Sequence, residues 1–171
     1  MGFARQETAS HLDALTKELR TFYVVRHAKA GSRGEWTGDD RLRPLSKKGQ
    51  TQADGLVALF EPFPIKAIFS SPYLRCMQTV EPLSRSRRLQ VKSSIELAEG
   101  HGLDGLNTFL GNSKLDHAVL STHGDIVWEL VEDLVARHVI RAGDGGFAKG
   151  STWVVRVQDG VPVKARYIPA P

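Results

Sequence analysis

The sequence contains a single cysteine, Cys76, among its 171 residues. One thiol cannot form an internal disulfide framework or a zinc cluster. No apolar run approaches the roughly 20 residues that a membrane-spanning helix requires. The N-terminal residues also lack the apolar core of a signal peptide. We therefore expect a cytoplasmic protein that does not contact a membrane.

The excess of charge of either sign is small, because 23 lysines and arginines oppose 19 aspartates and glutamates. The distribution is uneven, since the segment 21–50 holds seven basic residues and only three acidic ones. Such a local cationic field suits an anionic substrate. Aromatic residues do not alternate with these basic residues, as a platform for single-stranded nucleic acid requires. We therefore expect phosphorylated substrates and no nucleic-acid binding.

Apolar runs typical of buried strands alternate with helical patterns along the chain. We interpret residues 1–20 as an N-terminal extension with a helix carrying Leu12, Leu15 and Leu19, and 21–171 as one domain. The expected fold is a three-layer α/β/α sandwich with a largely parallel central sheet. Strands are predicted at 22–25, 66–69, around 91 and at 117–121, with a closing hairpin of 152–157 and 162–168; helices are predicted after Ser46, after Pro72, weakly at 106–110 behind a glycine-rich loop at 99–105, and at 125–139.

Three of the predicted strands end in residues suited to phosphate chemistry. The first ends in Arg26-His27 and the strand at 117–121 is followed by His123, while the strand at 66–69 leads into a helix whose first turn holds Arg75. Carboxyl ends of parallel strands share one rim of a sheet, so we expect these four side chains to lie together. Arginines offer forked donors matched to phosphate oxygens. A neutral imidazole among them is a nucleophile, and the positive charges should lower its pKa.

These segments resemble the histidine phosphatase superfamily, which includes phosphoglycerate mutases and protein phosphohistidine phosphatases. The resemblance rests on the strand into Arg26-His27, on Ser70-Ser71-Pro72 with Arg75 and Thr79 following, and on His123-Gly124. It covers about residues 21–157. It implies that His27 is phosphorylated and then hydrolysed, and that Arg26, Arg75 and His123 bind the phosphoryl group. It also implies that no metal ion or other cofactor is needed.

The leaving oxygen needs a proton, which a glutamate after the third strand supplies in larger members of that superfamily. The Leu-Ala-Glu sequence ending at Glu99 matches the context, so the resemblance makes Glu99 the candidate general acid and later base. Glu96 is the near alternative, and a surface role stays open for both. His101 could shuttle a proton or be an ordinary loop residue. We assign Asp125 to the stabilisation of a helix N-terminus rather than to the orientation of His123.

The segment after the nucleophile departs from the common pattern of the superfamily. Many members have Gly-Glu-Thr there, whereas this chain has Ala-Lys-Ala-Gly-Ser-Arg at 28–33. Arg33 stands where mutases place an asparagine, which argues against mutase activity. The segment 26–53 looks closest to short bacterial phosphohistidine phosphatases and to the phosphatase domain fused behind actinobacterial Nudix hydrolases. This chain has no Nudix box of its own.

The cationic loop leaves several interpretations open. Lys29 and Arg33 could bind a second phosphate, which would suit a nucleoside di- or triphosphate, or they could pair on the surface with Glu35 and Asp39. Trp36 could stack on a base, or it could anchor its loop by packing.

The function that these observations favour is hydrolysis of phosphate esters or anhydrides, nucleotides among them, through a phosphohistidine at His27. A protein phosphohistidine phosphatase is the alternative within enzymes. A non-catalytic protein that binds phosphorylated partners is the alternative of another class, although such a protein has no need of a nucleophile.

Overall fold

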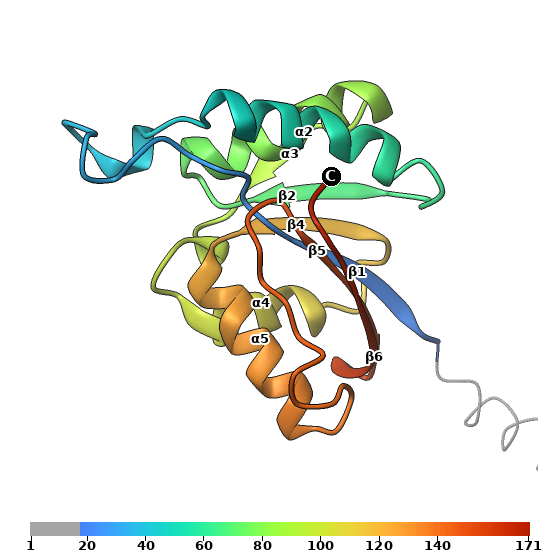
Figure 1. Cartoon of the computed structure of the whole chain (residues 1–171). Coiled ribbons are helices and arrows are strands. Elements are labelled where there is room, and N and C mark those ends of the chain that lie inside the picture. Colours follow the sequence, from blue (N-terminus) through green and yellow to red (C-terminus); the bar gives the residue numbers. More distant parts are fainter. Residues whose placement is uncertain (1–17) are drawn as a thin grey trace, which may run out of the picture.

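The computed structural model describes residues 18–171, drawn in colour in Figure 1. The helix predicted for the N-terminal extension falls almost wholly on residues 1–17, outside this part. Within the described residues every helix is too short or too polar to cross a membrane.

A central sheet of six strands organises the described part of the chain, in the order β3-β2-β4-β1-β5-β6. The pairs β3–β2, β2–β4 and β4–β1 are parallel, while β1–β5 and β5–β6 are antiparallel. The prediction of a largely parallel sheet is therefore confirmed. The strands are β1 (Arg20–Arg26), β2 (Ala67–Ser70), β3 (Val91–Ser93), β4 (Ala118–Thr122), β5 (Thr152–Gln158) and β6 (Val161–Ile168).

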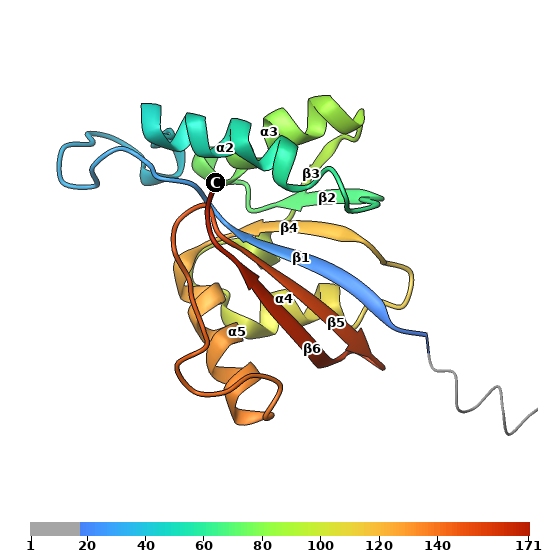
Figure 2. The same cartoon turned by 45° about the vertical axis from the view of Figure 1, so that its right-hand side comes forward.

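Helices cover both faces of the sheet, which confirms the predicted three-layer sandwich. Figures 1 and 2 show α2 (Lys47–Leu59) and α3 (Leu74–Arg87) on one face, and α4 (Gly102–Leu110) and α5 (Gly124–Ala136) on the other. Two short 3-10 helices, η1 (Asp40–Leu42) and η2 (Ile95–Leu97), lie in the connections.

The alternation of side chains along β1 divides the core in two. Phe22 and Val24 pack with α4 and α5, whereas Tyr23 and Val25 pack with α2 and α3. Successive residues of a strand point to opposite faces. The same alternation directs Arg26 toward the side of α5 and His27 toward the side of α3.

The predicted ends of several elements are confirmed. The Ser46 side chain caps α2 by accepting a hydrogen bond from the Gly49 N–H at 3.2 Å. This is the bond expected of a serine N-cap. The closing hairpin turns at Asp159 and Gly160, whose φ angles of 52° and 76° suit an Asp-Gly turn.

Two predicted boundaries were wrong. The glycine-rich loop at 99–105 is shorter than expected, because α4 already begins at Gly102. Gly105 lies inside this helix, and a Cβ there would stand 2.0 Å from the Glu96 carbonyl oxygen, so the glycine permits close packing rather than marking a loop. The helix predicted to reach residue 139 ends at Ala136, since the backbone turns left-handed at His138 with a φ of 58°.

Candidate active site

A pocket of about 670 Å³ opens at the carboxyl ends of β1 and β4. This is the rim on which the sequence places Arg26, His27 and His123, and all three line the pocket. Arg75, fully buried in the first turn of α3, is not part of the lining but contacts Glu99, which is. The four side chains from three strand ends are therefore brought together. Residues 29–33, Arg43, Ser46, Glu99, Gly124, Asp125, Trp128, Phe147 and Lys149 complete the lining together with these.

His27 has a fixed orientation and one free ring nitrogen. Its Nδ1 lies 2.8 Å from the Ala28 carbonyl oxygen. A carbonyl can only accept, so Nδ1 carries the proton and Nε2 of the neutral ring keeps its lone pair. The backbone here is braced by Thr79, whose Oγ1 accepts from the Ala28 N–H at 2.9 Å and donates to the Arg75 carbonyl at 2.7 Å.

The surroundings of His27 keep its ring neutral. Burial lowers the pKa of His27 to about 3, and the electrostatic influence of His123 and the charges of Arg75 and Arg26 act in the same direction. The hydrogen bond to Ala28 opposes them and is outweighed. At neutral pH His27 is therefore an uncharged imidazole, the form that a nucleophile needs.

His123 follows β4 as His27 follows β1. The two parallel strands are in register at Arg26 and Thr122, so the next residues are neighbours, and their ring centroids are 5.5 Å apart. Nε2 of His123 lies 2.8 Å from the Ser71 Oγ, while Nδ1 is buried without a partner among the described residues. Burial and then the charge of Arg75 lower the pKa of His123 to about 4.

Ser71 and Cys76 both lie next to Nε2 of His123, at 2.8 Å and 3.4 Å. Ser71 Oγ accepts from the Tyr73 N–H at 3.3 Å, and its own hydrogen can be donated to the His123 Nε2. In the tautomer in which Ser71 donates to Nε2, Nδ1 carries the ring proton as a neutral donor. His123 can therefore donate to a phosphoryl oxygen without bearing charge.

Arg26 is held against the start of α5. Its Nη1 donates to the Phe147 carbonyl at 2.6 Å. A Cβ at Gly124 would stand 2.7 Å from the Arg26 guanidinium carbon, so any other residue here would displace the Arg26 side chain. Gly124, in the His-Gly pair that follows β4, thus leaves the space that the Arg26 guanidinium occupies.

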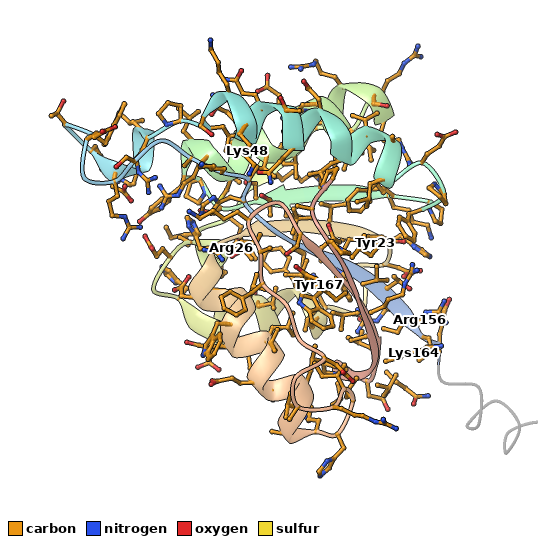
Figure 3. The ribbon with its side chains drawn as sticks, viewed as in Figure 1. Tyr23, Arg26, Lys48, Arg156, Lys164 and Tyr167 are labelled. Carbon is orange, nitrogen blue, oxygen red and sulfur yellow. The ribbon has the colours of Figure 1, made fainter. Side chains whose placement is uncertain are left out.

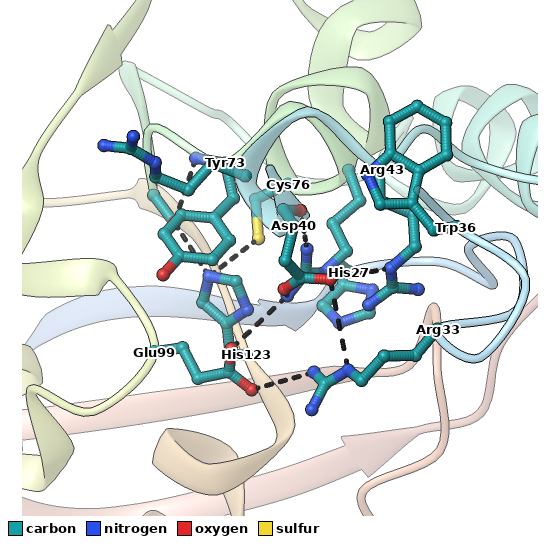
Figure 4. Close-up of polar contacts among 12 residues, drawn as sticks. His27, Arg33, Trp36, Asp40, Arg43, Tyr73, Cys76, Glu99 and His123 are labelled. Carbon is teal, nitrogen blue, oxygen red and sulfur yellow. Dashed lines mark hydrogen bonds and ion pairs between the residues drawn. The ribbon is translucent and has the colours of Figure 1, made fainter. Parts of the chain in front are cut away.

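Two carboxylates contact the buried Arg75. Its Nη1 donates to the Asp40 carbonyl at 2.9 Å, and its Nη2 lies 3.2 Å from Asp40 Oδ2 and 3.5 Å from Glu99 Oε2. Figure 4 shows the two carboxylates, with Asp40 paired to Arg43 and Glu99 paired to Arg33. Burial tends to raise the pKa of Asp40, but the hydrogen bond from Arg43 and the charges of Arg75, Arg43 and Arg33 outweigh it and lower that pKa. Asp40 is therefore ionised at neutral pH and shares its charge among three arginines.

Unpartnered polar atoms concentrate at this pocket. Among residues 18–171, four buried side-chain nitrogen or oxygen atoms have no hydrogen-bond partner, and three of them are Arg26 Nε, Arg75 Nε and His123 Nδ1. Buried polar groups without partners are uncommon and costly. Three such atoms on residues whose side chains commonly bind phosphate indicate a site for an anionic ligand.

The structure separates the candidate proton donors. Glu99 lines the pocket and is paired with Arg33 at 3.2 Å, whereas Glu96 is absent from the lining and accepts a hydrogen bond from the Ser94 hydroxyl. His101 lies outside the lining as the N-cap of α4. Asp125 lies in the first turn of α5, the place expected of a residue that stabilises a helix N-terminus. Its Oδ2 also accepts from the Gly100 N–H at 2.9 Å and so holds the loop that carries Glu99.

The cationic loop contributes more than the sequence suggested. Lys29 and Arg33 both line the pocket, and Arg33 pairs with Glu99 rather than with Glu35 or Asp39, the surface partners that were one of the two alternatives. The Trp36 indole donates to the Asp39 carbonyl at 2.9 Å and lies outside the lining, which fits an anchor rather than a base platform.

Sequence reasoning missed several residues of the pocket. Arg43 is 6% exposed and binds Asp40 and the Gly31 carbonyl, so it is a structural member of the site rather than a solvated charge. Lys149 arrives from the loop before β5, and burial followed by the charges of Arg26 and other basic neighbours lowers its pKa. No periodic pattern marks such loop residues. Within the described residues, no group of three or more His, Cys, Asp or Glu side chains could hold a metal ion.

Comparisons with known proteins agree with this geometry. The chain is 33% identical over 159 residues to the 8-oxo-(d)GTP phosphatase of Mycolicibacterium smegmatis, an alignment that covers 90% of this chain and 49% of the relative. The chain thus spans about half the length of that relative.

Solved structures share the fold. They include the protein histidine phosphatase SixA complexed with tungstate, with a TM-score of 0.69, 18% identity and coverage of 86% of this chain and 94% of that one. A mycobacterial glucosyl-3-phosphoglycerate phosphatase has a TM-score of 0.59, 16% identity and coverage of 88% and 97%. The family model of the histidine phosphatase superfamily (branch 1) matches residues 22–109. The chain belongs to the histidine phosphatase superfamily.

Proposed function

We propose that this chain is a phosphatase that transfers a phosphoryl group from an ester or anhydride to His27 and then to water, without a metal ion. The observation that carries the proposal is the state of His27. Its Nδ1 proton is fixed by the Ala28 carbonyl and its ring is kept neutral. The unprotonated Nε2 belongs to a residue that lines the same pocket as Arg26 and His123, whose N–H groups can bind phosphate oxygens.

In the first step, Nε2 of His27 attacks the phosphorus atom, an N–P bond forms, and the bond from phosphorus to the leaving oxygen breaks. Arg26, Arg75 and the Nδ1–H of His123 bind the equatorial oxygens, where charge has to be stabilised during transfer. In the second step water attacks the phosphohistidine, the N–P bond breaks, and inorganic phosphate leaves.

Glu99 is our candidate for the proton transfers. The substrate's phosphoryl group would replace Glu99 at Arg75 Nη2, which is only 3.5 Å from Glu99 Oε2 in the free structure. Two negative groups in one pocket favour a proton held between them. Glu99 then gives its proton to the leaving oxygen and takes one from the attacking water.

We further propose nucleoside di- or triphosphates as substrates. Lys29, Arg33 and Lys149 extend the cationic lining beyond the residues that one phosphoryl group can engage. A relative named as a phosphatase of 8-oxo-(d)GTP supports the same substrate class. Hydrolysis of a phosphohistidine protein is the alternative that a substrate screen distinguishes.

The mechanism is tested by quenching the enzyme during turnover and by replacing His27. We expect acid-labile phosphate on the wild-type chain and its absence, with a loss of activity, in His27→Ala. Wild-type turnover in His27→Ala would refute the covalent mechanism. The assays are run once in the presence of a chelator and once with added metal ions. Turnover that is seen only with an added metal ion would refute the metal-free proposal.

The role of Glu99 is tested by the leaving group. Glu99→Gln should slow hydrolysis of alkyl phosphates, whose leaving oxygen needs a proton, far more than hydrolysis of activated aryl phosphates. Equal losses for both would indicate that Glu99 only positions Arg33 and Arg75. Glu96→Gln, at the neighbouring carboxylate outside the lining, is the matched control.

A further inference from the structure

Two exposed aromatic side chains stand on the wall of the pocket. Trp128 of α5 is 47% exposed and Phe147, in the segment between α5 and β5, is 40% exposed, yet both belong to the pocket lining. Their ring centroids are 5.0 Å apart and their planes meet at 87°. Figures 1 and 2 show that this segment runs back along α5 toward the rim where β1 ends.

The Phe147 ring is not needed to hold its loop in place. The Gly146 carbonyl accepts from the Trp153 indole at 2.7 Å, and the Ala148 N–H donates to the Tyr167 hydroxyl at 3.4 Å. Tyr167, labelled in Figure 3, also packs where a Gly146 Cβ would be, 2.5 Å away. Neighbours on both sides thus fix the backbone, and the ring remains free to contact a ligand in a defined orientation.

Arg26 links the aromatic pair to the phosphate end of the pocket. Its guanidinium donates to the Phe147 carbonyl and lies 5.8 Å from the centroid of the Phe147 ring, within the range of a cation–π contact. A phosphoryl group on Arg26 would therefore have flat apolar surface on one side and the cations Lys29 and Lys149 elsewhere in the same pocket. The chemistry of such a ligand is a planar ring joined to a chain of phosphates.

We propose that Trp128 and Phe147 form a platform in which the base of a nucleotide stacks on one ring, with the perpendicular second ring against its edge, while its phosphates extend to His27. This inference rests on the proposed function and adds the residues that select the substrate. The volume of about 670 Å³ lies in the range of pockets that enclose small ligands. Every base has a flat face, so the platform selects for the presence of a base rather than for one base.

The experiment compares GTP with inorganic tripolyphosphate, which has the same phosphates and no base. Trp128→Leu and Phe147→Leu should each lower kcat/KM for GTP about 10- to 100-fold, the range expected for one lost stacking contact. Trp128→Leu should leave kcat/KM for tripolyphosphate within about two-fold, whereas Phe147→Leu, which also removes the ring beside Arg26, should lower it by less than it lowers the value for GTP. Trp128→Phe should retain most of the activity on GTP.

Trp36→Leu is the matched control, since Trp36 is an exposed tryptophan outside the pocket lining. It should leave the ratio of the two kcat/KM values unchanged. Equal losses for GTP and tripolyphosphate in the Trp128 and Phe147 variants, or no loss, would overturn the platform.

A binding measurement separates this inference from the proposed function. If the wild-type chain hydrolyses no phosphate compound, the proposed function fails, but calorimetry with GTP and tripolyphosphate on His27→Ala still tests the platform. Trp128→Leu in the His27→Ala background should weaken the binding of GTP and leave the binding of tripolyphosphate unchanged. If the wild-type chain is active on both compounds and the ratio does not respond to Trp128 or Phe147, only the platform is refuted.

Discussion

The buried histidines His27 and His123 make the stability of the fold depend on pH. Their pKa values in the folded chain, about 3 and about 4, lie below the value of about 6.5 for an unfolded histidine. Protonation therefore favours the unfolded chain. The contribution of the two neutral histidines to the free energy of unfolding is fully present above about pH 7 and is lost as the pH falls from 6.5 toward 4.

The structure sets the size of the effect. At pH 5 an unfolded histidine is almost fully protonated, whereas His27 and His123 are still almost wholly neutral in the folded chain. Each should lower the free energy of unfolding by about 2 kcal/mol between pH 7 and pH 5. The pair should therefore cost about 4 kcal/mol over this range, a large part of the stability of a typical domain.

Urea denaturation at half-unit steps between pH 7 and pH 5 measures this loss. His27→Asn and His123→Asn should each reduce it to about 2 kcal/mol, because one proton difference is removed. His138→Asn is the matched control, since His138 is exposed and asparagine tolerates its left-handed backbone. A loss that is the same in all four proteins would refute the assignment of low pKa values to the buried pair.

Three further predictions concern packing around the site. Gly124→Ala should displace Arg26 and lower kcat/KM for phosphate esters at least about ten-fold with little change in stability, measured by steady-state kinetics and urea denaturation; wild-type kinetics would contradict the close approach at this glycine. Thr79→Val should lower the free energy of unfolding by about 1–3 kcal/mol, because the Ala28 N–H loses its acceptor, and Thr79→Ser should restore it. Ser46→Ala should cost about 1 kcal/mol in the same assay and Ser46→Asp should not, and an equal cost in both would argue against the N-cap.

The sequence predicts those parts of the site that sit on regular elements. His27 and His123 each directly follow an apolar run, and a parallel sheet brings such positions together. Arg75 could be placed because Ser70-Ser71-Pro72 signals a helix start. The contacts of Asp40 and Arg43 with one another could not be predicted, since both lie in an irregular segment without periodicity.

The aromatic pair was beyond sequence reasoning for a similar physical reason. Trp128 has the spacing of an ordinary exposed helix residue, and the segment around Phe147 reads only as a glycine-rich loop. Only the return of that segment along α5 brings the two rings to one pocket. The start of α4 was misjudged because glycine usually breaks a helix, whereas Gly105 permits a close contact.

The position of β1 in the middle of the sheet has a consequence for mobility. Its backbone is hydrogen-bonded to β4 on one side and to β5 on the other. At the end of the strand, the Arg26 N–H donates to the Ser151 carbonyl and the His27 N–H donates to the Thr122 carbonyl. Amide protons here should exchange with solvent only when the whole domain unfolds. The loops that carry Arg33, Glu99 and Phe147 lie outside the sheet and are held by a few side-chain contacts, so sequence change there can alter which molecules are accepted while the nucleophile stays where the sheet holds it.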